Sequence, residues 1–566
     1  MTWIKFFRRG LTAFLIVIFL LSASLVGAAV EIFDGAGQYI MSDFENHDIA
    51  KQRAQQRAER DAQKKAGVAL KTFSRSINSE LTDDEISAVT NNIIKVSDVE
   101  IVPVPFEAKG EAGIMYRATL KATIDTDGIY TWLELDDKEK VTILNQNKDL
   151  QDAITKNDKQ VEDLKEEYNR ATSQYEKDKI RKQMNEADRD FLAQKKLIEG
   201  NMLFYVKDYN SAINIYNEAL QFGEYEVVYN NRGNVYAEIG QYELAIKDYD
   251  KATQLNPNHV DAYYNRGNAY AEGLKQYKEA IADYDKVIEL NPNYLRAYTN
   301  RGNVYADIRQ YERAIKDFDK AIKLNPIDSV AYNNRGTVYD DLGEYERAIK
   351  DYDKAIQLNP NHVDAYYNRG NAYAEGLKQY KEAIADYDKV IELNPNHFRA
   401  YTNRGNVYND LKQYERAIQD FDKTLQLNPN DSVAYNSRGN AYKGLKKYER
   451  AIKNYDNAIK LNPNDAGYYY NRGDSYRNLE QFELAIADYN KAININPSFA
   501  EAYNNRGLSY ALTRNFKQAI VDATKAIQLN PNYSNAYQLR GICYEALGEE
   551  EKAQVDFAKA KQLGWN

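Results

Sequence analysis

The residues best placed to do chemistry are asparagines that recur in register with evenly spaced glycines, from Gly200 to Gly541. We call the residue seven places before each glycine position 1 of a repeat. An amide side chain offers one acceptor and two donors, so a row of amides can pair with both polar groups of an extended peptide backbone. The position 6 asparagines are Asn231, Asn265, Asn300, Asn334, Asn368, Asn403, Asn471 and Asn505, and the position 9 asparagines are Asn234, Asn268, Asn303, Asn371, Asn406 and Asn440.

Other residue types show no pattern typical of a catalytic or metal site. Cys543 is the single cysteine and lies in an apolar helical pattern, and the four histidines are scattered. No glycine-rich phosphate loop and no pair of nucleophile and base stands out, so we expect no enzyme activity, no metal and no cofactor. The net charge is −9, with no basic cluster after the N-terminus. This argues against nucleic acid, whose binding needs clustered lysine and arginine.

The glycine spacing also predicts the elements that carry these rows. A period of 33 to 35 residues with small residues at fixed places is typical of paired helices stacked as a solenoid. Position 20 is alanine from Ala245 to Ala553, and position 24 is aromatic in nearly all repeats. The small residues at positions 8 and 20 would let two antiparallel helices approach closely. Asn-Pro pairs such as Asn256-Pro257 would end the second helix, because the residue before proline avoids helical angles.

With these residues, the segment 193–566 resembles the tetratricopeptide repeat (TPR) family, with about eleven repeats. The resemblance implies a right-handed α-solenoid whose first helices line a concave face, so positions 6 and 9 would meet a bound peptide. The rows are similar to the asparagine ladder of O-linked N-acetylglucosamine transferases. Asparagine is also common at these positions across the family, and the alternative is that it only keeps the surface soluble. The lysine with which some members hold a C-terminal carboxylate is missing at position 5.

Position 7 departs from the family pattern. Arginine stands where the family usually has leucine, in ten repeats from Arg232 to Arg540. Position 23 is aspartate in nine of the same ten repeats, and the exception is Asn454, opposite Arg438. A repeated pairing of this kind predicts a structural salt bridge between the two helices of a repeat and not a ligand contact.

The array contains an internal duplication, because Gln254–Asn293 is identical to Gln357–Asn396. Each copy includes the sequence AEGLKQY, which is one residue longer than the AEIGQY of a neighbouring repeat. A solenoid tolerates such copying since each repeat contacts only its neighbours. The duplication therefore indicates a lengthened binding surface and not an active site.

The N-terminus predicts export from the cytoplasm. Lys5, Arg8 and Arg9 precede Leu11–Val30, which carries no charge. A signal-peptidase cut after the small residues Ala28 or Ala29 is favoured, although residues 11–30 are also long enough to remain as a membrane anchor. Either arrangement leaves the positive flank inside, so the rest of the chain would be periplasmic, envelope-associated or secreted.

Residues 31–133 are expected to form a small α/β domain. Thr82-Asp83-Asp84-Glu85 is a capping box that would open one helix, and residues 99–104 and 114–124 read as two strands joined through Lys109-Gly110. A longer helix is predicted by alanines at every fourth residue, namely Ala50, Ala54, Ala58, Ala62 and Ala66. The order of elements resembles the N-terminal domain of flagellar assembly protein T and related envelope lipoproteins.

Residues 134–192 are charged and contain a heptad seam that slips near Asp178. Asn147 and Asn157 fall at core positions of this seam, where they would fix its register. The segment could form a coiled-coil dimer through residues 147–191, an antiparallel hairpin folded on its neighbours, or a solvated helical spacer. The seam consists of Leu150, Ile154, Val161, Leu164, Tyr168, Ala171 and Tyr175, followed by Ile180, Met184, Ala187 and Phe191.

From these features we predict a mainly α, non-enzymatic, extracytoplasmic protein–protein interaction scaffold. It would bind an unidentified protein or extended peptide on the concave face of its repeats. The alternatives are a structural spacer and an envelope-assembly factor that docks through its N-terminal domain. Residues 11–30 would be the part of the chain that associates with a membrane.

Overall fold

The computed structural model describes residues 32–41, 45–76, 94–108, 111–124 and 137–565. The chain divides into two compact parts, Met1–Ala297 and Tyr298–Asn566, and the division falls within the repeat array. The predicted export segment, the helix expected from Thr82 and the turn at Lys109-Gly110 lie outside the described residues.

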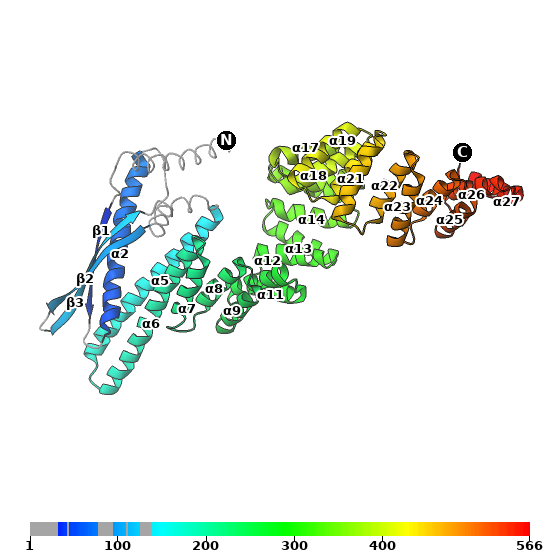
Figure 1. The fold of residues 1–566 in the computed structure, drawn as a ribbon. Coiled ribbons are helices and arrows are strands. Elements are labelled where there is room, and N and C mark those ends of the chain that lie inside the picture. Colours follow the sequence, from blue (N-terminus) through cyan, green and yellow to red (C-terminus); the bar gives the residue numbers. More distant parts are fainter. Residues whose placement is uncertain (1–31, 42–44, 77–93, 109–110, 125–136, 566) are drawn as a thin grey trace. The chain divides into compact units, whose positions relative to one another are not determined.

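The first described region is a three-stranded antiparallel sheet with one long helix against it (Figure 1). The strands are β1 (Ile32–Met41), β2 (Ile94–Ala108) and β3 (Glu111–Ile124), in the order β1-β3-β2, and the helix is α2 (His47–Ser76). Both predicted strands are present as β2 and β3. Strand β1 was not predicted, because Gly35 and Gly37 interrupt its apolar alternation.

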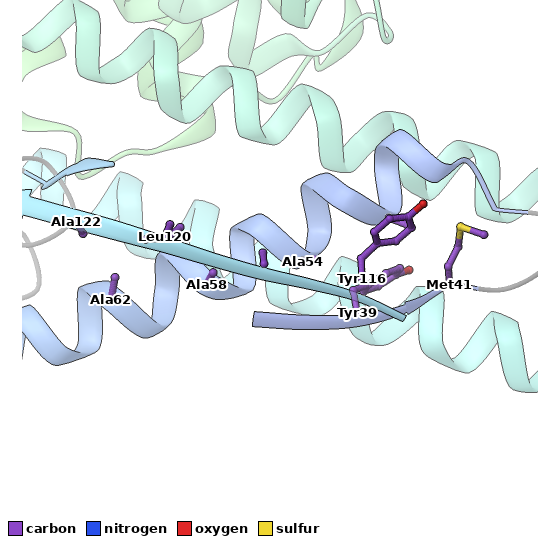
Figure 2. Close-up of a cluster of buried hydrophobic side chains, with 10 residues drawn as sticks. Tyr39, Met41, Ala54, Ala58, Ala62, Tyr116, Leu120 and Ala122 are labelled. Carbon is purple, nitrogen blue, oxygen red and sulfur yellow. The ribbon is translucent and has the colours of Figure 1, made fainter. Parts of the chain in front are cut away.

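The alanine stripe of α2 packs on the sheet as predicted, and all five of its alanines are fully buried. The stripe faces Tyr39 of β1 and Tyr116 and Leu120 of β3, which share one core cluster (Figure 2). A side chain at Gly35 or Gly37 would collide with the backbone of α2. These two glycines therefore let the helix lie unusually close to the strand, which explains why the helix face is made of alanine.

The charged segment forms an antiparallel hairpin of α5 (Asp137–Arg170) and α6 (Gln174–Tyr205) within one chain. Val161 and Leu164 of α5 pack against Ile180, Met184 and Ala187 of α6. The sequence left three arrangements open, and the structure has the hairpin. The seam residues therefore pack against residues of the same chain. Tyr175 is a correction to the seam, because it lies in the first turn of α6 and is 80% exposed. Helix α6 runs without interruption through residue 193 into the first repeat.

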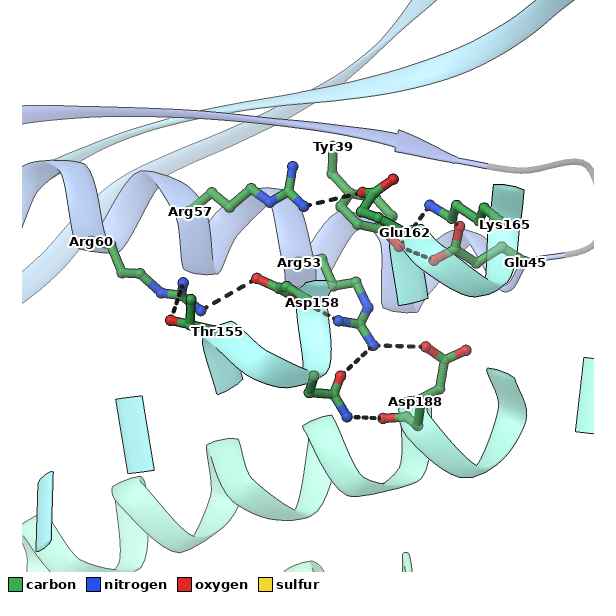
Figure 3. A network of polar contacts seen from close by, with 12 residues as sticks. Tyr39, Glu45, Arg53, Arg57, Arg60, Thr155, Asp158, Glu162, Lys165 and Asp188 are labelled. Atoms are coloured by element: carbon green, nitrogen blue, oxygen red, sulfur yellow. Dashed lines mark hydrogen bonds and ion pairs between the residues drawn. The ribbon is translucent and has the colours of Figure 1, made fainter. Parts of the chain in front are cut away.

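A buried polar network joins α2 to this hairpin (Figure 3). The guanidinium of Arg53 has no exposure and donates to Asp158, Asn157 and Asp188 at 2.6, 3.0 and 3.0 Å. Asn157 in turn donates to the carbonyl of Ala187 at 2.8 Å. Asn157 thus occupies a core position, as predicted, and its amide links both hairpin helices to α2.

From α6 onward the chain forms eleven helix pairs, all within the described residues. Each first helix is followed by an antiparallel second helix, as the sequence predicted. After the C-terminal part of α6 come α7 (Tyr209–Ala219), α8 (Glu226–Glu238), α9 (Tyr242–Leu255), α10 (Val260–Asn268), the π-helical turn η1 (Ala269–Leu274), α11 (Tyr277–Leu290), α12 (Leu295–Asp307), α13 (Tyr311–Leu324), α14 (Ser329–Asp341), α15 (Tyr345–Leu358), α16 (Val363–Asn371), the π-helical turn η2 (Ala372–Gly376), α17 (Tyr380–Leu393), α18 (Phe398–Asp410), α19 (Tyr414–Leu427), α20 (Ser432–Gly444), α21 (Tyr448–Leu461), α22 (Ala466–Asn478), α23 (Phe482–Ile495), α24 (Ala500–Leu512), α25 (Phe516–Leu529), α26 (Ser534–Ala546) and α27 (Glu550–Gln562).

The invariant small residues work as predicted. A Cβ on Gly336 would lie 2.8 Å from the ring of Tyr352, and Ala348 is fully buried beside them. The ring at position 24 therefore packs directly on the glycine at position 8. The extra residue of the duplicated block is absorbed in η1 and η2, where the last turn of the first helix widens.

Candidate functional site

The arginine at position 7 is the most regular polar feature of the array. Arg335 of α14 donates from Nε and Nη2 to the two carboxylate oxygens of Asp351 on α15, both at 2.7 Å. The side chain of Asp351 is only 10% exposed, so this two-pronged contact is largely protected from water. The hydrogen bond to Asp351 raises the pKa of Arg335, which keeps the guanidinium charged.

The predicted salt bridge recurs through the array and is confirmed. Arg438 is the exception that the sequence predicted, because its partner is not an aspartate: it donates to the amide oxygen of Asn454 at 2.7 Å. The ion pairs are Arg232–Asp248, Arg266–Asp283, Arg301–Asp317, Arg335–Asp351, Arg369–Asp386, Arg404–Asp420, Arg472–Asp488, Arg506–Asp522 and Arg540–Asp556.

Most of these arginines have a further partner that sequence reasoning missed. Nη1 of Arg335 donates at 2.5 Å to Asp319, which lies on the second helix of the preceding repeat. The same link joins Arg369 to Asp353 and Arg472 to Asp456. One guanidinium therefore ties three helices together and connects successive repeats. The signal was present in the recurring Asp-Tyr-Asp and Asp-Phe-Asp sequences, where the second aspartate occupies position 25.

The predicted asparagine rows lie together, and many of their amides bond to one another. Nδ2 of Asn334 at position 6 donates at 3.0 Å to Oδ1 of Asn303 at position 9 of the preceding repeat. Asn403 donates in the same way to Asn371 at 2.9 Å, and Oδ1 of Asn371 also accepts from Tyr387. The position 9 oxygen is thus held between the tyrosine of its own repeat and the amide of the next.

The other predicted residues follow this arrangement with local variations. Asn300 is half-buried on α12, and Asn268 accepts from Tyr284. The remaining donors and acceptors are Asn231 to Asn201, Asn265 to Asn230 and Asn234, Asn368 to Asn333 and Thr337, Asn471 to Asn436, Asn505 to Tyr470 and Asp474, and Tyr455 to Asn440.

Some amide groups remain uncommitted within the described part of the chain. Oδ1 of Asn368 and Oδ1 of Asn403 accept no hydrogen bond there, and Nδ2 of Asn371 donates none. Asn406 is half-buried on α18, and its side chain makes no hydrogen bond to another described residue. Successive first helices therefore still offer both acceptors and donors after their mutual bonds are made.

A cavity of about 400 Å³ lies where α12 and α14 meet. Asn303 and Asn334 line it together with the carboxylates of Asp307 and Asp341. Positions 6, 9 and 13 of adjacent repeats thus share one open recess. The guanidinium-bearing Arg309 also lines this recess. None of the described residues form a cluster suited to a metal ion.

Comparison with known proteins identifies the array. Models described as TPR repeat and tetratricopeptide repeat match residues 233–272 and 274–555, more than half of the chain. The chain belongs to the tetratricopeptide repeat family. The fold and period of the array agree with this assignment, and the resemblance of residues 31–133 to flagellar assembly protein T stays a prediction.

The TPR chain matches curated relatives over short segments only. It is 31% identical to sperm-associated antigen 1 of Mus musculus over 87 residues, which cover 15% of this chain and 10% of that protein. It is 28% identical over 127 residues to the Hsp70-Hsp90 organizing protein of Triticum aestivum, covering 20% and 22% of the two chains. A solved TPR protein from Parabacteroides merdae ATCC 43184 is 24% identical, with a TM-score of 0.37 over 44% of this chain and 98% of that chain.

Two further properties of the described residues bear on the site. The thiol of Cys543 is buried, and burial raises its pKa to about 11, so it would be a poor nucleophile. No helix in the described ranges has the length and apolar character needed to cross a bilayer.

Proposed function

We propose that this TPR protein is a non-enzymatic scaffold outside the cytoplasm that binds an extended polypeptide along its first helices. The repeats make the chain a protein–protein interaction scaffold. The observation that supports the finer proposal is the set of uncommitted amides at Asn368, Asn371, Asn403 and Asn406. An extended backbone presents one donor and one acceptor per residue. These amides can form hydrogen bonds with both groups, whichever side chains the polypeptide carries.

Asn406 offers the sharpest test of this site. Its side chain makes no hydrogen bond to another described residue, so Asn406→Ala should leave the stability of the array unchanged. Loss of a ligand hydrogen bond worth about 0.5–1.5 kcal/mol would weaken partner binding about two- to tenfold. Asn403→Ala is the matched contrast, since it also removes internal bonds to Tyr367 and Asn371 and should lower stability as well.

The partner can be identified by crosslinking in the native envelope. A photo-crosslinking amino acid at Thr337 or Asn406 should capture a polypeptide, because both positions lie on first helices beside the proposed backbone. The same residue placed at Lys316 or Lys350, which are exposed on second helices, should capture little. Equal yields from the two sets would contradict binding along the first helices.

The location follows from charge placement near the N-terminus, where Lys5, Arg8 and Arg9 precede the uncharged Leu11–Val30. Protease added to intact spheroplasts should therefore degrade the chain after residue 30. Protection that is lost only on lysis would place the protein in the cytoplasm and overturn this part of the proposal.

A further inference from the structure

Asp307 and Asp341, which line the recess between α12 and α14, belong to a longer row of acidic side chains in the second compact part. Position 13, in the last turn of the first helix, is Asp307, Asp341, Glu375 and Asp410 in four successive repeats. All four are exposed. Position 13 is also acidic in two earlier repeats, at Glu238 and Glu272, whereas the four repeats after Asp410 have Gly444, Asn478, Leu512 and Ala546 there, so the acids end at residue 410.

These carboxylates differ from the regularly spaced aspartates of the second helices. The aspartates at positions 23 and 25 are largely paired with arginine, as in Arg335 with Asp351 and Asp319. None of the four position 13 carboxylates makes an ion pair within the described residues, and Asp410 accepts only a hydrogen bond of 3.4 Å from Tyr380. Burial raises the pKa of the neighbouring Asp340 to about 6, and the charges of Asp341 and Glu375 add to this rise.

We propose that the groove over residues 303–410 selects an extended polypeptide segment with lysine or arginine at about every third residue. This inference rests on the proposed function and adds the chemistry of the partner. Unpaired carboxylates beside uncommitted amides give a surface in which the amides hold the backbone and the acids hold cationic side chains. Beyond residue 410 position 13 is not acidic, and Lys443 and Arg477 at position 12 contact Asp474.

The spacing follows from geometry. First helices whose asparagines bond directly to each other lie about 10 Å apart. A polyproline II segment advances about 3.1 Å per residue with three residues per turn, so side chains three apart point the same way at intervals of about 9 Å. One cationic side chain in three would therefore reach one carboxylate in each repeat.

The test uses the full chain and two fluorescent twelve-residue probe peptides with the same composition. One peptide carries lysine at positions 1, 4, 7 and 10, and the other carries four consecutive lysines. Fluorescence anisotropy at low salt should show the spaced peptide binding several-fold more tightly than the block peptide. Equal affinity for both peptides would mean that only net charge matters, and it would overturn the proposal.

Two variants of equal net charge locate the binding. The combined variant Asp307→Asn, Asp341→Asn, Glu375→Gln and Asp410→Asn should bind the spaced peptide about ten- to several-hundredfold more weakly, from about two- to fivefold for each of four exposed ion pairs. The control variant Glu312→Gln, Glu346→Gln, Glu382→Gln and Glu415→Gln removes four exposed acids from the second helices of the same repeats and should stay within about twofold. Equal losses in both variants would overturn the proposal, and the single variant Asp341→Asn repeats the test should the combined variant unfold.

The crosslinking yield at Asn406 separates this inference from the proposed function. If the acidic-row variant still captures its partner in full, the charge selection is wrong and the scaffold function stands. If no polypeptide is captured at Thr337 or Asn406 in the unsubstituted chain, the proposed function itself fails.

Discussion

The α/β region and the repeat array both depend on buried arginine, but they use it in different ways. Arg53 is completely buried and occurs once, and it joins segments that are 104 to 135 residues apart in sequence. Arg335 is 19% exposed and belongs to a series that repeats along the array, with partners 16 residues away on either side. A single long-range network makes one junction indispensable, whereas a repeated short-range pair spreads the same kind of contact over many equivalent places.

Loss of Arg53 should therefore give the largest effect. Arg53→Met would leave Asp158 and Asp188 without their shared cation, and removing one partner of a buried ion pair costs about 3–5 kcal/mol. We expect hydrogen exchange in α2 and α6 to accelerate while the array from α8 onward stays protected. Arg57→Met is the matched control on the same helix, since Arg57 contacts the half-exposed Glu162 at 3.3 Å and should cost under about 1 kcal/mol. Similar protection in both variants would remove the contrast between the two regions.

Loss of one arginine from the array should have a smaller and local effect. Arg335→Leu leaves Asp351 buried without a cation, at a cost of about 3 kcal/mol, felt mainly in α13 to α15 because each repeat contacts only its neighbours. The double variant Arg335→Leu with Asp351→Leu should recover part of this loss. Unfolding of the full mutant cycle checks the coupling, and strictly additive losses would show that the pair does not interact.

Restoring the missing aspartate should stabilise the array slightly. Asn454→Asp would let Arg438 form the two-pronged pair seen in the other repeats, but it removes the hydrogen bond that Asn454 donates to the carbonyl of Arg450 at 2.8 Å. The charge-assisted hydrogen bonds gained should outweigh this loss by about 1 kcal/mol in the free energy of unfolding. Thermal unfolding should shift upward by a few degrees, and a downward shift would mean that the Arg450 contact matters more.

The smallest expected effect is a pH dependence at Asp340. Its pKa lies at about 6 in the folded chain against a usual value of 3.8, because of desolvation and then the nearby Asp341 and Glu375. Between about pH 4 and pH 6 the folded chain therefore holds a proton on Asp340 that the unfolded chain has lost. The stabilisation from this proton is complete below about pH 4 and is lost as the pH rises through 6. Asp340→Asn should flatten this dependence and stabilise the chain at pH 7.5 by less than about 1 kcal/mol after solvent screening. Denaturation at pH 5 and pH 7.5 checks both the sign and the size.

Several outcomes show why local patterns were sufficient in the array. The Arg–Asp pair at positions 7 and 23 could be predicted because both residues belong to one repeat and recur in fixed register. The alanine stripe of α2 was equally clear, because a period of four identifies one helical face without knowledge of its partner. The predicted asparagine rows do lie beside one another, as the shared period required.

Other features depended on which distant segments meet. The heptad seam was compatible with a dimer, a hairpin or a spacer, and only the packing of Val161 against Ile180 and Met184 decides for the hairpin. Strand β1 was missed because its glycines make sense only against the close backbone of α2. The short turn after Arg170 also places Tyr175 outside the core, although its spacing fits the seam.

The sequence by itself determined the period of the array, the helix pairs and the pairing within each repeat, because these depend on residues that are close along the chain. Only the tertiary structure decided how each side chain uses its remaining hydrogen-bonding capacity. It links Arg335 backward to Asp319 and commits the amide of Asn403 to Asn371, whereas the side chains of Asn406 and Asp341 have no such partner among the described residues. The physical reason is that a hydrogen bond requires two groups to meet at about 3 Å, and spacing along the chain does not specify that meeting between separate helices.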